Sequence, residues 1–474
     1  MNLSNPNYYT TERAFQNYMH YGDENMISIA PIGGSWNGGP ALTYDAVTGY
    51  PNNIGAGNEA VMGLVMNSCE PVGTSFTITW TGPSNGIFVD GSTSAGTNTL
   101  TWTKNVGQEN FLVRFRSNSI SNLVIRRTAE PITGLFRKEF LDRCKRYNTL
   151  RLMNWGAINE WDTNITTWSQ RIPNTHRSKY SLVRGCPYET MIDLCNETQC
   201  NMWMNVPHVV NDAWITNLCN LIQSRRVGNW KVYLEWSNEV WNTFFVAQHN
   251  YAVANSANVN PWDWYEYVIT KTQAIGTVAR ATGLKIDLVL NLQAHTTDHT
   301  WYLKDRVSPA PYNLDGINTL AIAPYFGGRA HLTTPTDYRG QLLAGGLTEV
   351  FNHLNWHIDN ECVSSINSIK SVCAARGKNL VFYESGQHLL AAPDTDTPLV
   401  NLFISANRDG RMYDAYVKYL RLCHNMTPTL NCIFDSAREY SNKGTWGLVE
   451  YEGQSLTLAH KQRAWNDWLD ETKQ

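Results

Sequence analysis

The 474-residue sequence lacks several features that would assign it to common functional classes. Charged residues make up only 17% and the net charge is −3, so no basic excess is available for nucleic acid and no polybasic run for a membrane surface. No stretch reaches about 18 consecutive apolar residues, so no membrane-spanning helix is expected. Gly-x-Ser-x-Gly, P-loop and post-strand Gly-x-Gly-x-x-Gly motifs are also missing, which leaves serine hydrolase, nucleotide and dinucleotide functions without support.

The ten cysteines are scattered, with no Cys-x-x-Cys pair and no cysteine–histidine cluster of zinc-finger spacing. Buried free thiols are therefore expected, and one or two disulfides stay open for an oxidising compartment. The first nine residues are polar and have no basic segment followed by an apolar one, so the sequence as written predicts no secretory signal. Another export route, earlier removal of a signal, and release by lysis as for virion-associated enzymes stay open.

The residue composition and the hydrophobic pattern change along the chain. Residues 1–55 are irregular apart from one apolar run at 26–33. Residues 56–128 carry short β-branched and aromatic segments separated by Gly, Ser and Asn turns, which is typical of a small all-β sandwich. The four clearest segments are 75–80, 86–89, 99–102 and 111–115.

From about residue 130, helical patterns alternate with short apolar strands, which predicts parallel βα units. Helices are expected at 136–147, 187–198, 212–225, 262–282, 364–376 and 412–424, and strands at 149–154, 201–206, 232–237, 286–291, 319–323, 380–383 and 431–434.

These strands are one short of a closed (β/α)8 barrel, and the run at 26–33 is the natural candidate for the first. The predicted fold is thus an α/β (β/α)8 barrel with its start in 1–55, an all-β sandwich inserted at 56–128, and the remainder in 129–474. A separate sandwich preceding an incomplete barrel is the alternative.

Two glutamates, Glu239 and Glu384, each follow an apolar run and would end the fourth and seventh strands of that barrel. Those strands face each other across the barrel mouth. Two carboxylates about 5–5.5 Å apart, one an acid/base and one a nucleophile, are what retaining glycoside hydrolysis requires. The pattern therefore predicts this chemistry, with no metal or cofactor.

The order of residues at successive strand ends resembles clan A of the glycoside hydrolases, over roughly residues 130–450. The resemblance implies that Glu239 is the acid/base and Glu384 the nucleophile, and that Asn238 holds a sugar 2-hydroxyl. It further implies substrate-site roles for Arg151, His208, Tyr325 and, in the loop after the eighth strand, Trp446. The string around Trp236 and Asn242 also resembles poorly characterised bacterial proteins labelled cellulose-binding or clan A-like.

Other residues have roles that the sequence leaves more open. Glu235 is interpreted as a buried structural carboxylate paired with Arg151. Trp155 is taken as a cleft residue that stacks on sugar, although packing of its loop is an equal alternative, and 18 tryptophans and 23 tyrosines favour sugar contacts only slightly. His295 is predicted to line the substrate cleft.

The sequence thus predicts a retaining glycoside hydrolase whose partner is a polysaccharide or oligosaccharide, outside the cell or on a surface. A non-catalytic carbohydrate-binding protein and a virion- or surface-associated polysaccharide-degrading component are the alternatives. Sugar identity, linkage, endo or exo action and oligomeric state stay open.

Overall fold

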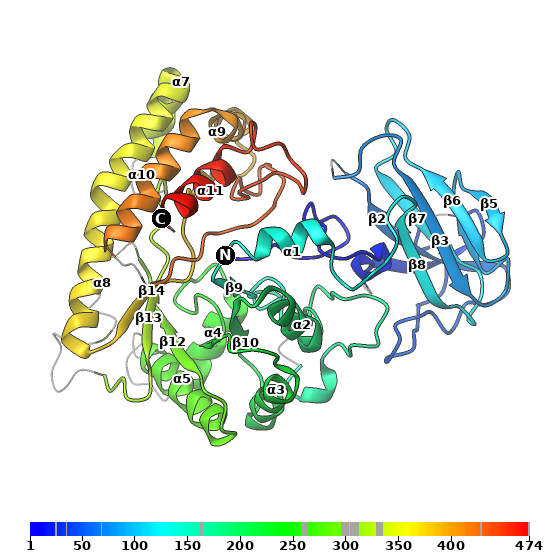
Figure 1. Cartoon of the computed structure of the whole chain (residues 1–474), viewed down its shortest axis with the longest axis horizontal. Coiled ribbons are helices and arrows are strands. Elements are labelled where there is room, and N and C mark those ends of the chain that lie inside the picture. The colour runs from blue at the N-terminus through cyan, green and yellow to red at the C-terminus, as the bar shows by residue number, and fades with distance from the viewer. Residues whose placement is uncertain are drawn as a thin grey trace.

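The computed structural model describes residues 1–23, 26–34, 36–67, 69–161, 165–256, 264–294, 303, 312–328, 335–426 and 429–472. An antiparallel β unit lies beside a larger α/β body, and the chain crosses between them more than once (Figure 1). All ten cysteines are buried and free, which confirms the expectation of thiols rather than disulfides. In the described part of the chain, no helix combines the length and apolar character needed to cross a membrane.

The β unit consists of two four-stranded antiparallel sheets. In β3 (Ser75–Thr81) alternate residues are buried, as expected for a strand with one face toward a core. Trp102 and Phe111, from opposite sheets, meet edge to face with ring centroids 4.7 Å apart. One sheet has the strand order β1 (Ile27–Pro31), β2 (Asn58–Val65), β7 (Asn110–Phe115), β4 (Ile87–Val89). The other has the order β5 (Thr93–Gly96), β6 (Thr99–Thr103), β3, β8 (Ser121–Arg127).

The prediction that residues 26–33 form the first barrel strand is wrong. β1 pairs antiparallel with β2, with Ile27 opposite Met62 and Ile29 opposite Ala60. A short apolar run fits a buried strand in either kind of sheet, so its periodicity could not distinguish them. The β unit therefore begins at β1 rather than at residue 56.

The α/β body is built on a curled sheet of six parallel strands, and the expected alternation with helices is present. Its strands, in spatial as well as sequence order, are β9 (Thr149–Arg151), β10 (Asn201–Val206), β11 (Val232–Trp236), β12 (Asp287–Asn291), β13 (Thr319–Ile322) and β14 (Asn379–Phe382). The expected helices correspond to α1 (Lys138–Cys144), α2 (Tyr188–Thr198), α3 (Asp212–Arg225), α5 (Trp264–Ala281), α8 (Val363–Arg376) and α10 (Arg411–Met426).

Two short segments continue this sheet at its edges without forming regular strands. Asn2 bridges in parallel to Arg151 of β9, and Asn431 bridges in parallel to Phe382 of β14. The two segments also meet, because the Asn2 backbone N–H donates to the Ile433 carbonyl at 2.9 Å. The curled sheet is thus joined edge to edge through the start of the chain.

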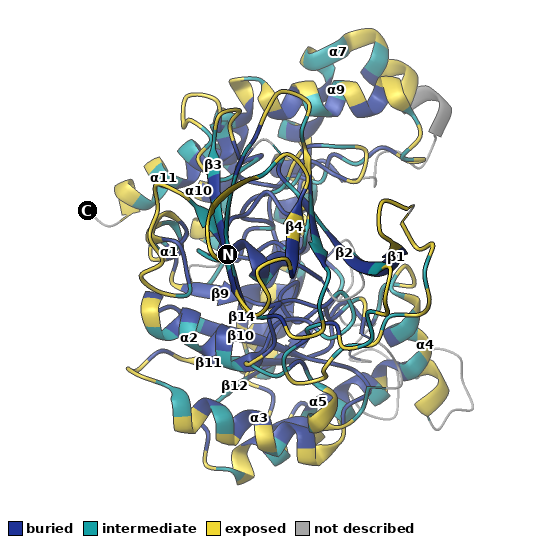
Figure 2. Cartoon of the chain, turned by 90° about the vertical axis from the view of Figure 1, so that its right-hand side faces the viewer, coloured by how far each residue is buried: buried dark blue, intermediate teal, exposed yellow. Residues whose placement is uncertain are grey.

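Further helices surround the sheet. Strands occupy the dark, buried centre in Figure 2, whereas the outer helices are exposed on one side. The kink in α7 falls at Gly346, whose φ of +59° lies in the left-handed region that favours glycine. Among the described residues, the helices not predicted from the sequence are α4 (Val246–Asn255), α7 (Pro335–His357), α9 (Thr397–Arg408) and α11 (His460–Thr472), a π-helix at Ile358–Cys362, and 3-10 helices at Tyr18–Tyr21 and Trp168–Gln170.

Candidate active site

Three parallel strands carry the predicted catalytic residues to one end of the sheet. Arg151 is the last residue of β9, Asn238 and Glu239 follow β11, and Glu384 follows β14. In barrel-like α/β folds this carboxyl end of the strands is where reactive side chains gather.

Arg151 joins these side chains into one hydrogen-bonded network, and its side chain is fully buried. Its Nη1 donates to Glu384 Oε1 at 2.7 Å. Its Nη2 donates to Asn238 Oδ1 at 2.8 Å and to Glu235 Oε2 at 3.0 Å. A planar guanidinium can serve several oxygens in fixed directions, so Arg151 sets the relative positions of both strand ends.

Glu235 is the structural carboxylate that the sequence predicted, and its pairing with Arg151 is confirmed. Its Oε2 also accepts from Trp203 Nε1 and from Asn205 Nδ2, each at 2.8 Å. Asn291 Nδ2 donates to Oε1 at 2.7 Å. With these donors on both oxygens, Glu235 is fixed in place and in turn holds Arg151.

Glu384 is held by a cation on one oxygen and a phenol on the other. Arg151 bonds Oε1, and the Tyr325 hydroxyl donates to Oε2 at 2.8 Å. The residue is 6% exposed. Burial raises the pKa of the Glu384 carboxyl, and the positive charge of Arg151 opposes that rise.

Glu239 has neutral partners instead. The Tyr383 hydroxyl donates to Oε1 at 2.7 Å and Asn242 Nδ2 donates to Oε2 at 2.9 Å. Burial raises the pKa of the Glu239 carboxyl as well, against the lowering effect of these hydrogen bonds. Glu239 and Ser237 have φ of +39° and +56°, a backbone region costly for residues other than glycine.

The two glutamates therefore differ in environment although both are almost fully buried. A negative charge on Glu239 disfavours ionisation of Glu384, so the pair loses its protons in two steps. Among the described residues, a cation bonds Glu384 and none bonds Glu239. Arg151 therefore acts directly on the charge of Glu384, whereas the described partners of Glu239 are neutral donors.

Among the direct hydrogen-bond partners of Arg151 and Glu239, three were missed in the sequence. Asn2 Oδ1 accepts from Arg151 Nη1 at 3.1 Å, and Tyr383 and Asn242 bond Glu239. Tyr383 and Asn242 lie close in sequence to the two glutamates, which was a usable signal. Asn2 has no local signal, because it reaches the site only through the edge-to-edge closure of the sheet.

Other predicted site residues lie outside this network. His208 is fully buried with its ring 5.3 Å from that of Tyr251, and burial lowers its pKa to about 4. Neither nitrogen of His208 has a hydrogen-bond partner among the described residues. Trp446 is half-buried, and its ring lies 5.6 Å from His388 and 5.7 Å from Phe434.

The expected cleft role of Trp155 is wrong. Its side chain is fully buried, and its ring stacks on Phe140 with centroids 6.1 Å apart and an interplanar angle of 9°. Phe15 and Phe136 contact it as well. A ring enclosed on several sides by aromatic residues has no face left for a sugar. His295 lies outside the described residues.

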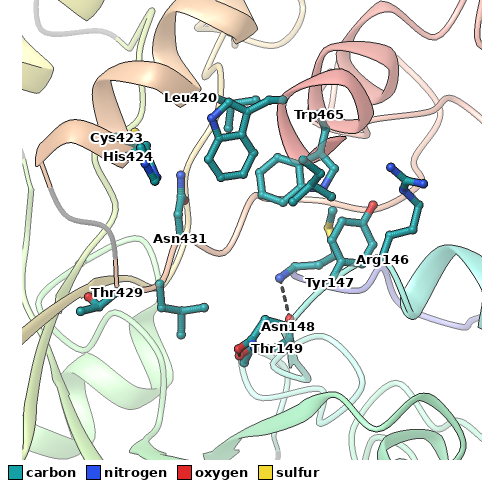
Figure 3. Close-up of a pocket in the computed structure, with 14 residues that line it drawn as sticks. Arg146, Tyr147, Asn148, Thr149, Leu420, Cys423, His424, Thr429, Asn431 and Trp465 are labelled. Carbon is teal, nitrogen blue, oxygen red and sulfur yellow. Dashed lines mark hydrogen bonds between the residues drawn. The ribbon is translucent and has the colours of Figure 1, made fainter. Parts of the chain in front are cut away.

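A cavity of about 170 Å³ lies elsewhere in the body, between α10, α11 and the start of β9 (Figure 3). Tyr147, Asn148 and Thr149 line one side, and Trp465 another. Thr149 begins β9, so the cavity is at the amino ends of the strands, away from the two glutamates. In the described part of the chain, no group of three His, Cys, Asp or Glu side chains is arranged to hold a metal ion.

No family model matches this chain, and no curated protein matches its sequence. Among solved structures, the xylanase 10B of Clostridium thermocellum (CBM22-1–GH10 modules) is similar with a TM-score of 0.38 and 9% identity, over 93% of this chain and 92% of that one. A fungal β-1,4-galactanase is similar with a TM-score of 0.30 and 9% identity, over 59% of this chain and 92% of that one. The GH113 β-mannanase of Alicyclobacillus acidocaldarius is similar with a TM-score of 0.24 and 10% identity, over 59% of this chain and 91% of that one. These neighbours are glycoside hydrolases.

Proposed function

We propose that this protein is a retaining glycoside hydrolase of the clan A kind, with Glu384 as nucleophile and Glu239 as acid/base. The observation that carries the proposal is the pair of buried glutamates at the carboxyl ends of β11 and β14, one bonded by a cation and the other by neutral donors. We take the segments at Asn2 and Asn431 as the first and eighth positions of a (β/α)8 barrel.

The difference in partners suits the two roles. Arg151 and Tyr325 favour the charged form of Glu384, which attacks the anomeric carbon while Glu239 gives its proton to the leaving oxygen. The glycosyl ester that forms on Glu384 removes its negative charge. Glu239, now ionised, takes a proton from water as the water oxygen attacks the anomeric carbon, and the ester bond to Glu384 breaks. Both carboxyls then return to their starting states.

Asn238 is placed to bind the sugar. Arg151 bonds its Oδ1 and thereby fixes which way the amide points. Asn238 Nδ2 donates to Asn159 Oδ1 at 3.1 Å, and no other described residue accepts from it, so its second hydrogen can bond a substrate hydroxyl. We extend the proposal to His208 and Trp446 as substrate contacts, because no described residue bonds the buried imidazole of His208 and an unpaired buried polar group is costly, while the partly exposed ring of Trp446 can pack on a sugar.

The test is a panel of polysaccharides, oligosaccharides and aryl glycosides, read out by reducing ends and released aglycone. Once a substrate is found, Glu384→Gln and Glu239→Ala should each lower turnover by at least about 10³-fold. Azide should partly restore Glu239→Ala with an activated aryl glycoside, because departure of a good leaving group needs no acid.

The matched control is Glu59→Gln, which alters a buried, arginine-paired carboxylate of the β unit and should leave turnover unchanged. Proton NMR of the first-formed product should show the anomer of the substrate. Activity of wild-type level in both site variants would contradict the assignment, and an inverted first product would contradict the retaining mechanism. A chain that binds a glycan but cleaves none would instead be a carbohydrate-binding protein.

A further inference from the structure

We infer that Tyr383 is a positioning residue that orients Glu239 and sets the pH at which Glu239 releases its proton. The inference deepens the proposed function, since Glu239 is its acid/base. It goes further in assigning one strand end, Tyr383-Glu384, to both halves of the chemistry: one residue attacks, and its neighbour controls the proton donor.

The geometry starts from a single short contact. The Tyr383 hydroxyl donates to Glu239 Oε1 at 2.7 Å, and the phenol ring is fully buried. Asn242 occupies the other oxygen of Glu239 at 2.9 Å. The carboxyl plane is therefore fixed by two donors that approach from different segments, and Tyr383 is the one that comes from the strand of the nucleophile.

Tyr383 is itself held on three sides, so its hydroxyl has little freedom to turn away. Its backbone N–H donates to the Ile322 carbonyl at 3.0 Å, and its carbonyl accepts from Asn2 Nδ2 at 2.9 Å. The guanidinium of Arg151 lies over its ring, 5.0 Å from the centroid. A phenol fixed in this way keeps the Glu239 carboxyl in one orientation through the catalytic cycle.

Several charged or titratable groups influence Glu239, but in the described residues only Tyr383 among them bonds it directly. Burial raises the pKa of Tyr383 well above its ordinary value, so its hydroxyl stays a donor through the working pH range. The groups concerned are Arg151 at the end of β9, Glu235 in β11, Tyr325 after β13, and Tyr383 and Glu384 after β14.

A hydroxyl that donates to a carboxylate favours the charged form of that carboxylate. Without Tyr383, Glu239 should therefore keep its proton to higher pH. In a retaining reaction, Glu239 is protonated when the glycosyl-enzyme forms and charged when water hydrolyses it. Loss of the hydroxyl should consequently slow the second step more than the first and allow the glycosyl-enzyme to accumulate.

The experiment is a titration of the protein labelled with ¹³C at glutamate Cδ, in wild type and Tyr383→Phe, with the Glu239 resonance assigned from its loss in Glu239→Gln. The apparent pKa of Glu239 should rise by about one to two pH units in Tyr383→Phe. With an active substrate, the alkaline limb of kcat/KM should move in the same direction, and burst kinetics should show slower hydrolysis of the intermediate.

Two further tyrosine variants separate this role from general effects of losing a buried hydroxyl. Tyr325→Phe should move the titration of Glu384 and the acidic limb instead, since Tyr325 bonds Glu384. Tyr419→Phe should move neither, because that hydroxyl donates to the Pro324 carbonyl at 2.7 Å. Should Tyr383→Phe not fold, Tyr383→Met takes its place.

A folded Tyr383 variant whose Glu239 resonance titrates as in wild type would overturn the inference. That result does not depend on any substrate. Failure to find glycosidase activity would therefore count against the proposed function, while the NMR titration would still decide the role of Tyr383.

Discussion

Replacement of Arg151 by methionine should destabilise the protein strongly, because the guanidinium is the shared partner of two buried carboxylates. Arg151→Met leaves Glu235 and Glu384 without their cation. Breaking a buried ion pair by removal of one partner costs about 3–5 kcal/mol, most of it from the charge left behind. An unfolding entropy of about 2.1 cal/mol/K per residue amounts to about 1 kcal/mol/K over 474 residues, so the melting temperature should fall by about 3–5 °C.

The assay is calorimetry at neutral pH with urea unfolding in parallel. The matched control is Arg225→Met, since Arg225 bonds Asp193 at 2.6 Å but is 38% exposed, and its loss should cost no more than about 1 kcal/mol. The double variant Arg151→Met with Glu235→Gln should recover part of the stability, because one stranded charge is gone. Equal stability of Arg151→Met and wild type, or a double variant less stable than Arg151→Met, would refute the reasoning.

Two further predictions concern residues around the site. Trp155→Ala should lower the free energy of unfolding by about 3–5 kcal/mol in urea titrations and leave KM unchanged, because Trp155 stacks on Phe140 in the core. A raised KM with unchanged stability would instead show that the Trp155 ring contacts substrate. Lys461→Met should raise KM several-fold and change the fluorescence of Trp446, because the buried Lys461 ammonium donates to the Thr445 carbonyl at 2.5 Å and to the Trp446 carbonyl at 3.3 Å. The control is Lys378→Met, which removes another lysine bonded to two carbonyls. It should leave KM and the Trp446 fluorescence unchanged.

The parts of the fold that the sequence predicted are those with strong local periodicity. Alternation of buried and partly exposed residues marked β3, and apolar strands between helical patterns marked β9 to β14. Glu239 and Glu384 were found because each follows such a strand. Glu235 could be assigned a structural role because period-two alternation places it on the same face as Glu239, deeper in the sheet.

What failed depended on contacts that no local pattern contains. The run at 26–33 is equally suitable for a parallel or an antiparallel partner, and only pairing with β2 decides between them. Trp155 follows a strand end just as a cleft residue would, and its burial depends on Phe15, Phe136 and Phe140. Asn2 lies in a segment too short to show any periodicity.

The closure of the sheet through Asn2 has a consequence for how the protein is made. The side chain of Asn2 bonds the carbonyl of Ile433, 431 residues away in the chain. A ribosome adds about 5–20 residues per second, so Asn2 emerges roughly 20–90 s before Ile433 exists. The edge of β9 stays open until Ile433 has been made, and Arg151 can meet Glu235 about 7–30 s before Glu384 exists. The Arg151–Glu384 ion pair and the closure of the sheet through Asn2 therefore form later than the Arg151–Glu235 ion pair.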